Sequence, residues 1–73
     1  MTSAKLIGER IKKIRKSKKM TQYDLADKVG TTHCSISNWE EGKRCMSIYY
    51  FSKLCKALDV SADYLLFGKE QKE

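Results

Sequence analysis

The 73-residue sequence has no proline, and no apolar run in it approaches the roughly 20 residues that cross a bilayer. It also lacks a basic segment leading into an apolar stretch and a cleavage site, which would mark a secretory signal. We therefore expect a cytoplasmic protein. Its length predicts a single small domain, in which a large catalytic pocket is difficult to build.

Cysteine is scarce, and its spacing does not suggest a binding site. Cys34, Cys45 and Cys55 are odd in number and include no Cys-x-x-Cys pair. This pattern argues against a disulfide framework, and His33 beside Cys34 does not have the spacing of a zinc site. We expect reduced, half-buried thiols, with no metal, no cofactor and no small-molecule ligand.

Signals for strands are nearly absent, whereas signals for helix ends recur. Gly30, Gly42 and Gly68 each follow a stretch with helical apolar periodicity, as glycine does at helix C-termini. Residues that favour helix N-caps precede these stretches. The N-cap candidates are Ser3, Thr21, Thr32, Ser47 and Ser61. The sequence predicts an all-α fold with helices at Ala4–Lys18, Gln22–Val29, His33–Glu41, Ile48–Leu58 and Ala62–Phe67. Residues 1–68 would form the domain and residues 69–73 a short charged tail.

Apolar side chains at helical spacing predict the core. In the first expected helix, Ile7, Ile11 and Ile14 form one stripe, and Gly8 inside it suggests the close approach of a neighbour. The other inward residues are expected to be Leu25, Ala26, Val29, Ile36, Trp39, Phe51, Leu54, Cys55, Leu58 and Leu65.

Positive charge is concentrated at one end of the chain. The net charge is +6, and residues 1–19 hold eight cations and one anion. A polyanion is the natural partner for such a segment. A merely solvated helix face is an alternative, and so is binding to an anionic membrane surface. The membrane alternative is weaker because this segment has no Trp or Phe to anchor it, so we expect no membrane partner.

The stretch from Thr21 to Gly42 reads TQYDLADKVGTTHCSISNWEEG. It resembles the helix-turn-helix of phage repressors and Cro proteins, the XRE family (Cro/C1 type). The matching positions are Thr21-Gln22, Leu25-Ala26, Gly30, Ile36-Ser37, Trp39-Glu40 and Gly42. The similarity extends over residues 6–68. It implies a compact five-helix, lambda-repressor-like DNA-binding domain, with the helix-turn-helix at its second and third helices.

In this family the second helix of the motif enters the major groove. Around Ile36, positions 33, 34, 37, 38 and 41 lie on the opposite, free face. The resemblance therefore implies base reading by His33, Cys34, Ser37 and Asn38, and phosphate contacts from Arg15, Gln22, Thr32, Ser35, Lys43 and Arg44. Four alternatives stay open. His33 is either a base reader or a plain surface residue, and Cys34 either contacts a base or only fills space near the helix start. Arg15 matches a residue that pairs internally with the equivalent of Glu40 in relatives, and Glu41 either reads cytosine or points away.

Two departures from the family pattern follow the motif. The loop after Gly42 lacks the usual proline, so the path of Lys43 and Arg44 is less defined. The segment beginning with Tyr49 and Tyr50 is unusually aromatic. We expect a homodimer interface formed by Tyr64, Leu66 and Phe67, with one or both of these tyrosines nearby.

The function expected from these features is sequence-specific binding to double-stranded DNA. We expect a transcriptional regulator, a repressor that acts as a homodimer on an inverted-repeat operator. A protein-interaction module on the same fold, either antitoxin-like or an antirepressor, is the alternative. No constellation of catalytic residues suggests an enzyme.

Overall fold

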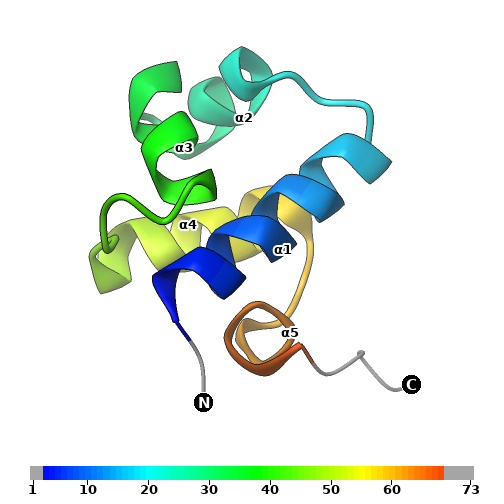
Figure 1. The fold of residues 1–73 in the computed structure, drawn as a ribbon. Helices are drawn as coiled ribbons and strands as arrows, with labels where there is room; N and C mark the ends of the chain where they lie inside the picture. Colours follow the sequence, from blue (N-terminus) through cyan, green and yellow to red (C-terminus); the bar gives the residue numbers. More distant parts are fainter. Residues whose placement is uncertain (1–2, 69–73) are drawn as a thin grey trace.

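A computed structural model of the chain describes residues 3–68, and within them the fold consists of five α-helices and no strand (Figure 1). The helices are α1 (Ala4–Ser17), α2 (Gln22–Val29), α3 (His33–Glu40), α4 (Ile48–Leu58) and α5 (Ala62–Phe67). The all-α prediction is confirmed. Two of the predicted helices, the first and the third, end one residue earlier than expected, and the predicted charged tail lies outside the described residues.

Each helix begins at its predicted N-cap. The hydroxyls of Ser3, Thr21, Thr32, Ser47 and Ser61 accept a hydrogen bond from a backbone N–H in the first turn of their helix. Thr21 and Asp24 form a full capping box, because each side chain accepts from the other residue's N–H. Gly30 ends α2 with a left-handed φ of 87°, which glycine adopts without steric cost.

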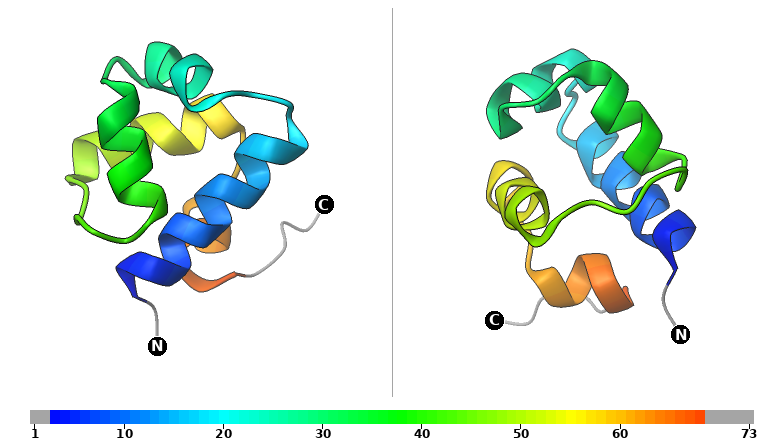
Figure 2. Two further views of the ribbon diagram at one scale, coloured as in Figure 1. Left: turned by 45° about the horizontal axis from the view of Figure 1, so that its top comes forward. Right: turned by 90° about the vertical axis from the view of Figure 1, so that its left-hand side faces the viewer.

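The helices enclose one core. α1 packs against α3 and α5, while α2 packs against α3 and α4. In all views α2 and α5 lie at opposite ends of the molecule (Figures 1 and 2). The completely buried side chains are Ile11, Leu25, Ile36, Leu54, Leu58 and Leu65.

Gly8 allows α1 and α3 to approach each other closely. A Cβ at this position would overlap the backbone carbonyl oxygens of Trp39 and Glu40. The predicted close approach is therefore confirmed. It fixes the C-terminal end of α3 against α1.

Several burial predictions were wrong in degree. Phe51 and Cys55 are half-buried rather than core, because the far side of α4 is only partly covered. Cys34 and Cys45 are exposed, not half-buried, since one lies on the outer face of α3 and the other in the loop before α4.

Within residues 3–68, no helix combines the length and the apolar character that a membrane span requires.

Candidate nucleic-acid interface

The outer face of α3 carries short polar side chains. Ile36 and Trp39 hold the inner side of the helix in the core, with exposed fractions of 0% and 6%. On the other side, Cys34 is exposed, while His33, Ser37 and Asn38 are partly exposed. The structure thus brings together all four predicted base-reading residues on one accessible helix face. Glu41 is exposed just beyond the end of the helix.

His33 is held by a residue that sequence reasoning missed. The ring of Tyr23, in the first turn of α2, stacks on the His33 ring with centroids 4.1 Å apart and an angle of 24° between the planes. The Tyr23 hydroxyl lies 3.3 Å from His33 Nε2, and Cys34 Sγ lies 3.8 Å from the same nitrogen. The only sequence signal for Tyr23 was an aromatic residue at an otherwise polar helix start.

A buried charge network connects α1, α2 and α3. Arg15 Nε and Nη2 donate to the two carboxylate oxygens of Glu40 at 2.6 and 3.1 Å, and Nη1 donates to the Met20 carbonyl oxygen at 2.7 Å. Gln22 Nε2 donates to the same carboxylate at 3.0 Å. Arg15 and Glu40 are only 6% and 4% exposed. This placement favours the internal pair over a direct phosphate contact for Arg15.

The remaining predicted phosphate-contacting residues surround α3. Thr32 and Ser35 lie at its N-terminus, where Thr32 Oγ1 accepts from the Ser35 N–H at 3.2 Å and donates to Ser35 Oγ at 3.3 Å. Past its C-terminus, Arg44 is exposed, and Lys43 Nζ lies 3.1 Å from Glu41 Oε1. Helix N-termini present N–H groups and partial positive charge, which suit phosphate.

The start of the loop after α3 is held by backbone contacts, although the loop lacks proline. Gly42 has a φ of 73°, and a Cβ there would lie 2.7 Å from the Cα of Lys5 in α1. The Lys43 N–H donates to the Asn38 carbonyl oxygen at 2.9 Å. These contacts set the start of the Lys43-Arg44 segment relative to the outer face of α3.

The basic segment of α1 is divided between internal and exposed cations. Arg15 is buried, and Arg10 Nη1 donates to the carbonyl oxygens of Leu65 and Leu66 at 3.0 and 3.1 Å, near the end of α5. The exposed cations of residues 1–19 are Lys5, Lys12, Lys13, Lys16, Lys18 and Lys19. The exposed positive charge of this segment is therefore carried mainly by lysines, while Arg10 and Arg15 bind groups of other parts of the fold.

One carboxylate of the site region has a perturbed pKa. The backbone N–H and the hydroxyl of Thr21 in the capping box hold the pKa of Asp24 below its ordinary value, and Lys28 adds to this effect. Burial raises the pKa of the Cys55 thiol, which keeps that group protonated and uncharged.

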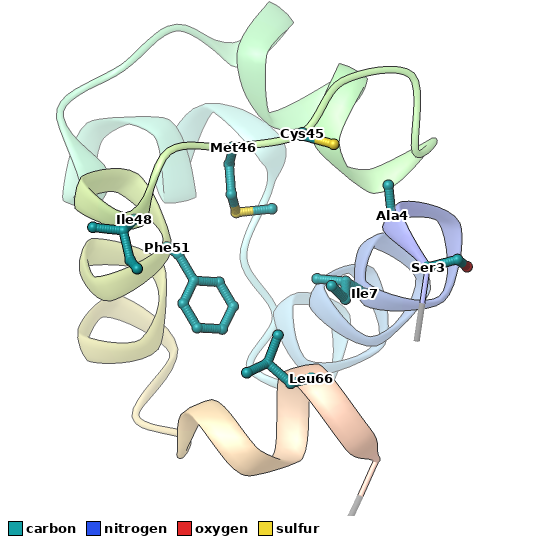
Figure 3. A pocket seen from close by; sticks show the side chains of 8 residues that line it. All are labelled: Ser3, Ala4, Ile7, Cys45, Met46, Ile48, Phe51 and Leu66. Carbon is teal, nitrogen blue, oxygen red and sulfur yellow. The ribbon is translucent and has the colours of Figure 1, made fainter. Parts of the chain in front are cut away.

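The predicted dimer residues differ in accessibility. Phe67 is 61% exposed, while Tyr64 and Leu66 are partly buried. The Leu66 side chain points into an apolar surface pocket of about 330 Å³, and Ile7 and Phe51 also line this pocket (Figure 3). Sequence reasoning missed Ile48, which lines the same pocket and is 86% exposed.

A second large hydrophobic side chain of α4 is exposed next to Ile48. Tyr49 is 58% exposed, its ring packs edge-on against Tyr50 with centroids 5.1 Å apart, and Lys53 Nζ lies 5.4 Å from the centroid of the Tyr49 ring.

Among the described residues, no three His, Cys, Asp or Glu side chains are grouped so that they could hold a metal ion.

This geometry is that of a helix-turn-helix domain, and comparison with known proteins agrees. The family described as helix-turn-helix matches residues 11–65, and the chain belongs to this family, of the XRE type. It is similar to the HTH-type transcriptional regulator YqaE of Bacillus subtilis, with 38% identity over 93% of this chain and 59% of YqaE. Similarity to the HTH-type transcriptional regulator DicA of Escherichia coli is 40% over 92% of this chain and 50% of DicA.

Among solved structures, the c2 repressor of phage P22 in complex with a synthetic operator superposes with a TM-score of 0.84. The two chains are 41% identical over 88% of this chain and 97% of that one. The predicted family and the predicted five-helix repressor-like fold are therefore confirmed. The chain spans half to three fifths of the length of YqaE and DicA.

Proposed function

We propose that this protein binds double-stranded DNA in a sequence-specific manner, regulates transcription and acts as a repressor by occupying a promoter. The observation that carries the proposal is the outer face of α3, where His33, Cys34, Ser37 and Asn38 lie together on a helix anchored from behind. Short donors and acceptors on an accessible helix suit the edges of base pairs in the major groove. The protein would act in the cytoplasm, at the nucleoid, and by binding rather than by catalysis.

In this proposal each group of the interface has a distinct role. Asn38 pairs with adenine and His33 donates to guanine, while Cys34 and Ser37 contact neighbouring base edges. Thr32, Ser35, Lys43 and Arg44 contact phosphates on either side of the groove, together with the second amide hydrogen of Gln22. Arg15 acts indirectly, because it orients Gln22 through their shared partner Glu40.

We further propose that the protein binds as a symmetric homodimer. A single α3 of eight residues reaches only about four or five base pairs, which are too few to define one site in a genome. The interface would include Tyr64, Leu66 and Phe67. The exposed side chains of Ile48 and Tyr49 are available to extend it. A closed two-fold arrangement is the most common way to double a binding surface.

Selection from a random pool of DNA duplexes tests the proposed function. The wild-type protein should enrich an inverted repeat, and a variant carrying His33→Ala and Asn38→Ala should enrich none while remaining folded. If the two proteins recover the same unenriched pool, sequence-specific binding by α3 is ruled out.

A protein-interaction role remains the second candidate, and the exposed apolar side chains of Ile48, Tyr49 and Phe67 favour it. An antitoxin-like or antirepressor module would use this surface and would not need the outer face of α3. In that case an Ile48→Glu variant would lose activity in cells, whereas the His33 and Asn38 substitutions would not affect it.

A further inference from the structure

The stacked pair of Tyr23 and His33 lies at the edge of the proposed DNA-binding face and links its two helices. Tyr23 is 65% exposed, so it contributes little to the core, yet its ring covers the ring of His33 at 4.1 Å. We propose that Tyr23 is a positioning residue for base reading: it fixes the orientation and the tautomer of His33. This inference rests on the proposed function and names a specificity determinant within it.

Two adjacent side chains of α2 hold the two ends of α3. Gln22 reaches the last residue of α3, Glu40, with a hydrogen bond of 3.0 Å. Tyr23 reaches the first residue of α3, His33, through both its ring and its hydroxyl. Side chains of consecutive helical residues point about 100° apart, which allows the first turn of α2 to make both contacts. The partner of Gln22 is buried, whereas the partner of Tyr23 lies on the accessible side of α3.

The contact of Tyr23 with Nε2 determines whether the other ring nitrogen, Nδ1, is a hydrogen-bond donor or an acceptor. In a neutral imidazole one nitrogen carries the proton and the other accepts. The Tyr23 hydroxyl lies 3.3 Å from Nε2. Because a phenol is a better donor than acceptor, in this proposal the hydroxyl is the donor and Nε2 is the acceptor. The ring proton is then on Nδ1, which becomes a donor. A donor at the level of the purine 6-position favours the O6 acceptor of guanine and is disfavoured opposite the amino group of adenine, whereas the N7 acceptor is common to both purines.

The stack also reduces the number of orientations open to His33. A histidine at the start of a helix, without such a neighbour, rotates about two side-chain bonds, and binding must then select one orientation. Stacking on Tyr23 makes this selection before DNA arrives, and preorganisation of this kind favours the correctly matched ligand. Tyr23 thereby influences specificity without contacting a base.

The first test uses the free protein and does not depend on DNA binding. Nitrogen chemical shifts of the His33 ring, measured at a pH where the imidazole is neutral, report its tautomer. The wild-type protein should hold the proton on Nδ1, and Tyr23→Phe, which keeps the ring but loses the hydroxyl, should move it to Nε2. The same tautomer in both proteins overturns the inference.

The second test measures base preference at the position that selection assigns to His33. The readout is the ratio of affinities for duplexes with guanine and with adenine there. His33→Ala should lower this ratio about three- to tenfold, as expected for one hydrogen bond. Tyr23→Leu should produce most of that loss, Tyr23→Phe a part of it, and Tyr23→Leu should have no further effect in the His33→Ala background.

Asp27→Ala serves as the matched control, because Asp27 is an exposed residue of the same helix outside the proposed interface. It should leave the ratio unchanged. A preference for guanine that Tyr23→Leu does not alter contradicts this inference alone. If the wild-type protein shows no base preference at any position, the proposed function fails, and the inference fails with it.

Discussion

Residues on the outer face of α3 and residues beside it are expected to differ in what their loss does to binding. Asn38→Ala should cost about 1–3 kcal/mol on the preferred site and relax specificity at one base pair, because a bidentate contact to adenine is lost. Lys43→Ala should weaken binding to all sequences alike and make the slope of log affinity against log salt less steep by about one unit. Titrations with the selected duplex and a shuffled one, at several salt concentrations, measure both effects.

One result would contradict these different roles of Asn38 and Lys43. If Asn38→Ala weakened binding equally on every sequence, α3 would be in contact with the backbone rather than the bases. Ser52→Ala provides a control, because Ser52 is exposed on α4 and its hydroxyl donates to the Tyr49 carbonyl oxygen.

The Arg15–Glu40 pair is expected to be strongly coupled. Glu40→Leu leaves the guanidinium of Arg15 buried without its carboxylate, which should destabilise the protein by about 3–5 kcal/mol. The double variant Arg15→Met with Glu40→Leu removes both charges and should recover much of that loss. Urea unfolding of the two single variants and the double variant gives the coupling free energy. Additive effects would show that the pair is not coupled.

At the scale of elements, the start of α2 should be sensitive to acid. The pKa of Asp24 is lowered in the folded protein, so its contribution to stability is fully present above the pKa of the unfolded chain. It is lost as the pH falls through the lower, folded-state pKa. The difference in unfolding free energy between wild type and Asp24→Asn should therefore be positive at neutral pH and shrink in acid.

Thermal unfolding of both proteins across the acidic range measures this difference. Taking the difference between the two proteins cancels the contributions that they share. A difference that did not change with pH would show that the capping box does not depend on the charge of Asp24.

The helix boundaries were predictable because local chemistry sets them. A hydroxyl at each of Ser3, Thr21, Thr32, Ser47 and Ser61 and a glycine such as Gly30 act within one turn of their own position. The C-cap of α4 had no comparable signal, since the left-handed residue there is Asp59 with a φ of 57°.

The candidate site was predictable only in part. Periodicity around Ile36 located the outer face of α3 correctly. Two contacts between side chains of different helices, however, could not be predicted, because no pattern in the sequence indicates them. The stacking of Tyr23 on His33 depends on the crossing of α2 and α3. Likewise, the orientation of the Leu66 side chain toward Ile7 and Phe51 depends on how α5 packs against the rest of the fold (Figure 3).

For the whole molecule, a two-fold dimer predicts a fixed distance between half-sites. Their centres should lie about one helical turn, 10–10.5 base pairs, apart. Inserting five base pairs moves one half-site to the opposite side of the duplex and should abolish tight binding, whereas inserting ten should restore part of it. Phe67→Glu, at the exposed end of α5, should weaken binding to the full site but not to a single half-site.

Gel shifts with these duplexes provide the measurement. Equal affinity for a half-site and for the full inverted repeat would contradict the dimer, as would a Phe67→Glu variant that binds the full site normally. Neither result would bear on reading of the bases by α3.

The central claim is that α3 reads a DNA sequence, and one affinity ratio tests it most directly. Fluorescence anisotropy at fixed, near-physiological salt should show that the wild-type protein binds its selected duplex at least about a thousandfold more tightly than a shuffled duplex of the same composition. With His33→Ala and Asn38→Ala together, the two affinities should converge toward the weaker value. Equal affinity of the wild-type protein for both duplexes would contradict the account.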